Sequence, residues 1–176
     1  MPAASCEMMQ RWLAMRMESD CHHADGAHPG LSGLGLSRAL GKAEERCAQV
    51  QARLTPPRRR VLELLLQSDG PLKAYDLMAA FGAQGQPAKP PTVYRALDFL
   101  ERQGFAHRIE SLNAYVPCRL DGAGHSAAFL ICDCCGAAAE FEPDFGPQLA
   151  AAAQAGYAVR AVTLEARGLC GACREA

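Results

Sequence analysis

The sequence lacks a long uninterrupted apolar run. Apolar side chains recur between residues 8 and 17, but Arg11 and Arg16 interrupt them, so the pattern predicts neither a secretory leader nor a membrane span. We therefore expect a cytoplasmic protein with no membrane partner. The chain also lacks a dominant sign of charge, because 18 Lys and Arg face 19 Asp and Glu. Total charge gives no support to nucleic-acid binding, so the distribution of charge along the chain has to be examined.

Several catalytic patterns are missing as well. The sequence contains no His-Glu-x-x-His, no His-x-Glu combined with Pro-Cys-x-x-Cys, and no nucleophile elbow, which argues against the common zinc enzymes and serine hydrolases. We expect no enzymatic activity and no small-molecule substrate. A length of 176 residues with 49% hydrophobic side chains is enough for one domain or two small ones, which excludes disorder throughout.

Charge is unevenly distributed along the chain. Residues 53–108 hold nine Lys and Arg against five Asp and Glu, a net charge of +4. Residues 109–176 hold four against eight, a net charge of −4. The basic part is also the part in which helical patterns gather, so any DNA-binding surface is expected there.

An amphipathic helix is predicted within residues 90–107. Pro90 suits its first turn and Gly104 offers the left-handed residue that ends a helix. Its apolar side chains recur at i, i+3, i+4 and i+7: Val93, Ala96, Leu97 and Leu100. Such a helix alone is more often an ordinary surface helix than one that contacts DNA.

The neighbouring segments make DNA binding the better interpretation. A short helix is predicted at residues 74–81, and Gly82, Gly85 and Pro87 separate it from the longer one. Two extended runs, residues 107–110 and 114–116, follow as a hairpin. Helix, turn, helix and wing together predict a winged helix-turn-helix, with Arg95 near the start of the second helix expected at a base edge. The other residues expected to contact DNA are Tyr94, Thr92, Lys89, Tyr75 and Arg58.

The segments before this unit have different characters. Residues 1–38 include a stretch rich in Gly, Ser, His and Pro, a composition that seldom packs into a regular element. We therefore expect these residues to form a flexible arm. A helix is predicted from residue 39 to 50, and another begins at Pro56 with Thr55 as its cap. The Arg triplet at residues 58–60 is suited to phosphate contacts.

The last part of the chain predicts a small α/β domain. Apolar strands are expected at residues 127–131, 137–141 and 157–164, with an Ala-rich helix at 145–154. The predicted organisation is therefore α+β. The arm covers 1–38, the winged-helix domain 39–117, a linker 118–124, and a dimerisation and zinc-binding domain 125–176.

Two Cys-x-x-Cys pairs form the strongest chemical signal. Among nine cysteines, Cys132 pairs with Cys135 and Cys170 with Cys173, a pattern that favours structural zinc in a reducing compartment. A redox dithiol or unliganded core cysteines are the alternatives. Cys134 is a competing thiol, although the spacing favours the two matched pairs.

The run at residues 89–97, with Gly104, Phe105 and His107 after it, resembles the ferric uptake regulator family, and its zinc uptake regulator branch fits best. The resemblance covers about residues 54–173. It implies a fold in which the last domain pairs two subunits. It also implies a sensory zinc site made of four side chains: His107, Cys118, His125 and Glu140.

The implied function is a zinc-responsive homodimeric repressor that binds operator DNA and controls zinc uptake genes, with two zinc ions per subunit. Imidazole, thiolate and carboxylate ligands suit four-coordinate zinc better than a harder metal. An iron or peroxide sensor of the same family is the nearest alternative, although only His125 stands where the iron branch usually carries a His-rich run. A zinc-stapled interaction module is the other.

Overall fold

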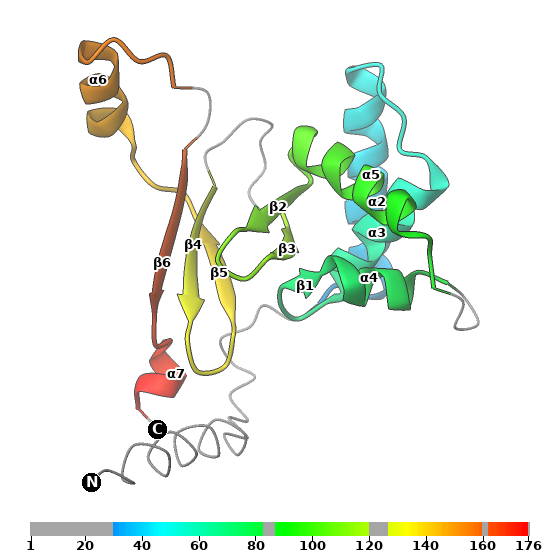
Figure 1. The fold of residues 1–176 in the computed structure, drawn as a ribbon. Helices are drawn as coiled ribbons and strands as arrows, with labels where there is room; N and C mark the ends of the chain where they lie inside the picture. The colour runs from blue at the N-terminus through cyan, green and yellow to red at the C-terminus, as the bar shows by residue number, and fades with distance from the viewer. Residues whose placement is uncertain (1–29, 83–86, 120–126, 160–161, 176) are drawn as a thin grey trace, which may run out of the picture.

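The computed structural model describes residues 30–82, 87–119, 127–159 and 162–175, which form two domains joined side by side (Figure 1). The first domain contains four helices and a three-stranded antiparallel sheet of order β1-β3-β2. Its elements are α2 (Gly33–Gln49), α3 (Pro56–Gln67), β1 (Leu72–Lys73), α4 (Ala74–Phe81), α5 (Pro90–Arg102), β2 (Ala106–Ile109) and β3 (Ala114–Pro117). No helix among the described residues is long and apolar enough to cross a bilayer.

The predicted helix-turn-helix and wing are present in this domain. The four apolar side chains expected to face inward from α5 are buried, and Phe99 joins them. Gly104 has a φ of +66°, the left-handed conformation predicted to end the helix. The β2–β3 hairpin pairs His107 with Val116, and Asn113, with a φ of +48°, closes its turn. The fold of this half therefore confirms the winged-helix prediction.

Helix α2 begins earlier than predicted. It starts at Gly33 rather than at residue 39, and Leu36 is buried in the core of the first domain. Just before the helix, the backbone N–H of Leu31 donates to the carbonyl of Leu66 at 2.7 Å. Local glycines disfavour a helix, but the packed stripe of Leu36, Leu40, Ala43 and Cys47 outweighs them. Residues 30–38 thus belong to the folded domain, whereas the rest of the predicted arm lies outside the described residues.

Leu40 and Leu34 lie on different faces of α2 and test this packing. Leu40 is 2% exposed and Leu34 77% exposed. Leu40→Ala should lower the free energy of unfolding by about 2–5 kcal/mol, because it leaves a cavity in the core. Leu34→Ala should change it by less than about 0.5 kcal/mol. Urea unfolding at fixed zinc measures both, and equal effects would show that α2 is not part of the core.

The second domain is built on a mixed sheet of order β5-β4-β6. Its elements are β4 (Ala127–Cys132), β5 (Ala138–Phe141), α6 (Gly146–Gln154), β6 (Thr163–Gly168) and α7 (Gly171–Arg174). Strand β5 is antiparallel to β4, while β6 is parallel to it. Helix α6 lies beyond one end of the sheet (Figure 1), and none of its residues is buried.

The last strand departs from its predicted position. The sequence predicts residues 157–164, but β6 spans Thr163–Gly168, and Tyr157 is exposed outside it. Parallel pairing with β4 selects the segment that forms the strand, including the charged Glu165 and Arg167, in preference to the alternating apolar residues. The shift brings the strand close to the second cysteine pair.

A small apolar cluster joins the two domains. Ile109 and Val116 of the hairpin pack with Phe129 and Ile131 of β4, and Leu112 of the hairpin turn packs against the same group. Figure 1 accordingly shows the β2–β3 hairpin beside the second sheet. The wing therefore packs directly against the second domain.

Candidate metal centres and nucleic-acid face

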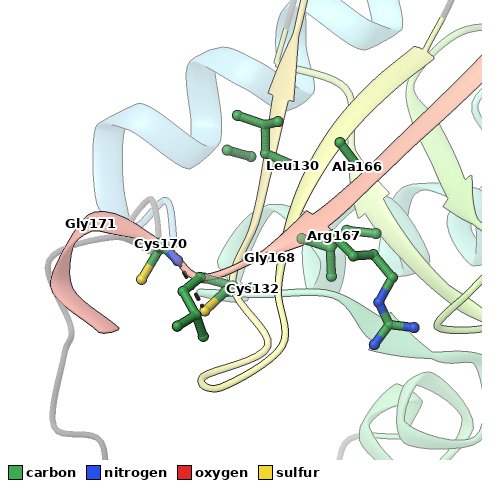
Figure 2. A pocket seen from close by; sticks show the side chains of 11 residues that line it. Leu130, Cys132, Ala166, Arg167, Gly168, Cys170 and Gly171 are labelled. Carbon is green, nitrogen blue, oxygen red and sulfur yellow. Dashed lines mark hydrogen bonds between the residues drawn. The ribbon is translucent and has the colours of Figure 1, made fainter. Parts of the chain in front are cut away.

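The four cysteines of the matched pairs meet at one end of the second sheet. Their sulfur atoms all lie within 4.8 Å of one another, and the sulfurs of Cys135 and Cys170 are 3.9 Å apart. The parallel register pairs Cys132 with Gly168, which places Cys170 two residues past the end of β6. Figure 2 shows Cys132 and Cys170 together, with the backbone N–H of Cys170 donating to the Cys132 sulfur at 3.3 Å. This arrangement fits four-sulfur coordination of one metal ion.

The turn after β4 supports this cluster. Gly136 has a φ of +73°, which glycine adopts without strain, and its N–H donates to the carbonyl of Cys132 at 3.1 Å. The N–H of Cys132 in turn donates to the carbonyl of Ala137. Across the sheet, the guanidinium of Arg167 donates to a carboxylate oxygen of Asp133 at 2.6 and 2.8 Å. These contacts hold the first cysteine pair beside the second one.

The electrostatics of the cluster favour a bound cation. Burial by itself raises the pKa of the Cys132 thiol, but backbone N–H groups of Cys135, Cys170 and Cys134 lower this pKa to about 6. By contrast, burial and the neighbouring thiol of Cys170 raise the pKa of Cys173 far above its usual value. One thiolate therefore forms readily at neutral pH, whereas a full set of thiolates needs a positive ion among the sulfurs.

Cys134 is exposed and does not belong to the four-sulfur group. The matched spacing that favoured Cys132 with Cys135 therefore agrees with the geometry. Among the described residues, the four-cysteine cluster is one of two groups of side chains that could hold a metal ion.

The second group joins the two domains. It contains His107 on β2, Cys118 just after β3 and Glu140 on β5, with ligand atoms within 4.8 Å of one another. His107 Nε2 lies 3.1 Å from Glu140 Oε1, and the Glu140 side chain is only 3% exposed. The backbone N–H of Arg119 donates to the other carboxylate oxygen at 2.9 Å. His125, the fourth member implied by the family resemblance, lies outside the described residues.

The residues predicted at DNA occupy different surroundings. Tyr75, Lys89, Tyr94 and Arg95 are exposed on α4 and at the start of α5, and Thr92 is half-buried. These exposed side chains surround the N-terminal end of α5. In helix-turn-helix proteins, the N-terminal residues of the recognition helix contact base edges in the major groove.

Arg58 is held within the domain. Its guanidinium lies 3.6 Å from the centre of the Phe99 ring and donates to the carbonyl of Arg53 at 2.6 Å. Arg59 and Arg60 likewise form ion pairs, with Glu44 and Glu63. These partners inside the domain would compete with a phosphate for the three guanidinium groups, and the predicted phosphate contact of the triplet stays a prediction.

Glu165 is a contact residue that sequence reasoning missed. From β6 its carboxylate accepts hydrogen bonds from the backbone of the hairpin turn in the other domain. A single acidic residue in a strand gives no signal of such a role, since most are solvated.

Comparisons with known proteins agree with these features. The sequence pattern of the "Ferric uptake regulator family" matches residues 49–167. The chain is 50% identical over 141 residues to the zinc uptake regulation protein of Escherichia coli (strain K12), covering 77% of this chain and 81% of that protein. The corresponding protein of Shigella flexneri shows the same identity and coverage.

Two solved structures are similar over most of the chain. One is a zinc uptake regulator complexed with zinc and DNA, with a TM-score of 0.75 and 47% identity over 81% of this chain and 97% of that one. The other is the holo form of XcZur, with a TM-score of 0.71 and 43% identity over 80% and 99% of the two chains.

Proposed function

Because the chain belongs to the ferric uptake regulator family, we propose that it is a zinc-responsive transcriptional repressor. In this proposal it binds operator DNA as a homodimer when loaded with zinc and controls zinc uptake genes. The observation that carries the proposal is the meeting of His107, Cys118 and Glu140 from both domains, since one ion held there would fix how the domains are arranged.

Two zinc ions per subunit are proposed. The four-cysteine site would hold one permanently, since four protein sulfurs leave no open position on a tetrahedral ion. The site at the domain junction would hold the sensory ion, with His125 as its fourth ligand. Its imidazole, thiolate and carboxylate donors favour zinc over iron or manganese. Both sites need reduced thiols, which favours a cytoplasmic location. We propose a regulatory role and no enzymatic reaction for these two sites.

A second copy of the chain is the proposed partner of the second domain. On β4, Leu130 is 52% exposed, and its register partners on the flanking strands are the small residues Ala139 and Ala166. A hollow of about 410 Å³ on this face is lined by Leu130, Ala139 and Ala166, and Leu130 and Ala166 are labelled in Figure 2. An apolar sheet face of this kind is typical of a homodimer interface.

Arg95 tests the DNA-binding part of the proposal. Arg95→Ala should weaken binding to the correct operator by about 1–3 kcal/mol and relax discrimination at one base position, because a bidentate contact to guanine is lost. Lys89→Ala should weaken binding to all sequences alike and flatten the salt dependence. Binding titrations against operator variants measure both effects. Unchanged specificity of the Arg95 variant would contradict the assignment.

A zinc-titrated DNA shift assay with the purified, metal-analysed protein tests the function itself. We expect operator binding to rise with zinc as the second ion per subunit binds. A response to iron or peroxide in place of zinc would favour the other sensors of the family. Absence of metal-dependent binding to any palindromic operator would favour a zinc-stapled interaction module.

A further inference from the structure

The tip of the wing is attached to the second domain by one carboxylate. The backbone N–H of Glu110 donates to Glu165 Oε1 at 2.6 Å, and the N–H of Ser111 donates to Glu165 Oε2 at 3.1 Å. Each carboxylate oxygen thus accepts from a different amide, across 55 and 54 residues of sequence. Hydrogen bonds to an ionised acceptor are about twice as strong as neutral ones.

The surroundings of Glu165 hold it in place for this contact. On β6 it is the register partner of Phe129 on β4, which is fully buried in the cluster that joins the domains. Leu112, at the hairpin turn, packs against that cluster. The hairpin turn therefore rests on the second sheet through the side chain of Leu112 and through hydrogen bonds from Glu110 and Ser111 to Glu165.

The charge on Glu165 is stabilised by these same contacts. Burial by itself raises the pKa of its carboxyl group, but hydrogen bonds from Ser111 and Glu110 and the nearby Arg167 bring this pKa below its ordinary value. The group is therefore ionised at neutral pH, and an ionised carboxylate only accepts hydrogen bonds. Both of its oxygens are thus suited to facing backbone N–H groups.

The turn itself is stiffened from within. The guanidinium of Arg108 donates to the side-chain oxygen of Asn113 at 3.0 Å and lies 3.3 Å from the carboxylate of Glu110. The N–H of Asn113 donates to the carbonyl of Glu110, closing the turn. Because the turn is stiff and α5 is followed in the chain by β2, the position of the hairpin tip affects the orientation of α5.

The candidate sensory site and Glu165 hold opposite ends of the hairpin. His107 and Cys118 lie near its base, whereas Glu110 and Ser111 form its tip. A body attached at one point can still rotate about it, but attachment at two separated points fixes its orientation. Resting on the proposed function, we propose that Glu165 is a positioning residue that sets the orientation of the reading helix α5 on the second domain, at a contact that contains no metal.

Coupling to zinc follows from this arrangement. If Glu165 and the zinc ion at the domain junction stabilise the same docked orientation, each must strengthen the other by the same factor. Loss of the Glu165 contact should then weaken zinc at the junction and operator binding together. The four-cysteine ion, held within the second domain alone, should be unaffected.

Glu165→Gln tests the proposal in the zinc-loaded full-length protein. Glutamine keeps the shape but offers one acceptor oxygen, while its NH₂ group would face an N–H donor. Amide hydrogen exchange at Glu110 and Ser111 should become about tenfold faster, and operator affinity should fall about tenfold, the factor equivalent to one hydrogen bond of typical strength. Glu142→Gln, at an exposed position after β5, is the matched control and should change neither quantity.

Two results would overturn the proposal. Unchanged exchange at Glu110 and Ser111 in Glu165→Gln would show that the carboxylate does not hold the wing. Faster exchange with unchanged operator affinity and unchanged zinc affinity at the junction would show a local contact with no positioning role. Failure of the proposed function would appear separately, as a wild-type protein whose operator binding does not respond to zinc.

Discussion

Cys170→Ser is expected to remove zinc from the four-cysteine site and to unfold the second domain. The Cys170 sulfur is one of the four, and its backbone N–H also donates to the sulfur of Cys132. A structural zinc site supplies about 10 kcal/mol or more of folding free energy. This exceeds the total free energy of unfolding of many small domains. Loss of one zinc ligand should therefore unfold the second domain.

Zinc content and circular dichroism of the purified variant measure this effect. Cys134→Ser is the matched control, because Cys134 lies in the same turn but is exposed and outside the four-sulfur group. The control should keep its zinc and its spectrum. A Cys170 variant with wild-type zinc content and fold would exclude a structural role for the site.

Cys118→Ser should abolish the zinc response while leaving the fold intact. Cys118 is half-buried and directly follows β3, the last strand of the wing. Serine is nearly the same size but a much poorer zinc ligand at neutral pH. We therefore expect the four-cysteine ion to remain and the stimulation of operator binding by zinc, typically 5- to 150-fold for a coupling of this kind, to disappear.

His107→Ala should also abolish the zinc response, and it should lower the stability of the contact between the domains as well. The His107 ring centre lies 5.9 Å from that of Phe129 in the cluster between the domains, so alanine removes packing as well as a ligand. Cys118→Ser is consequently the cleaner variant. Operator titrations with and without zinc, combined with metal analysis, measure both. A normal zinc response in either variant would show that the sensory site lies elsewhere.

The first domain could be predicted from sequence wherever local signals decide the structure. Helix α4 spans the predicted residues, and α5 begins at Pro90 and is followed by the left-handed Gly104 as expected. The start of α2 and the position of β6 could not be predicted. Leu36 extends the buried stripe of α2, but the glycines around it obscure that signal, and pairing with β4 rather than local alternation determines the position of β6.

The candidate sites show the same division. Regular Cys-x-x-Cys spacing predicted the two cysteine pairs, because this spacing is typical of two ligands to one tetrahedral zinc ion. His107, Cys118 and Glu140 come from separate elements and were grouped only through the family resemblance. Glu165 and the internal contacts of Arg58 were missed, since both depend on which side chains the fold brings opposite them.

The parallel pairing of β4 with β6 has a consequence for how tightly the four cysteines would hold the proposed zinc ion. Cys135 and Cys170 are 35 residues apart in the chain, and bringing such ends together in a free peptide costs about 3 kcal/mol of chain entropy. In the folded protein the strand pairing has already brought them together. While the strands are paired, the four cysteines should therefore bind zinc roughly a hundredfold more tightly than an unstructured peptide with the same spacing, and zinc should stabilise the strand pairing by the same factor. Substitutions that loosen the β4–β6 ladder should release the metal without touching a sulfur atom.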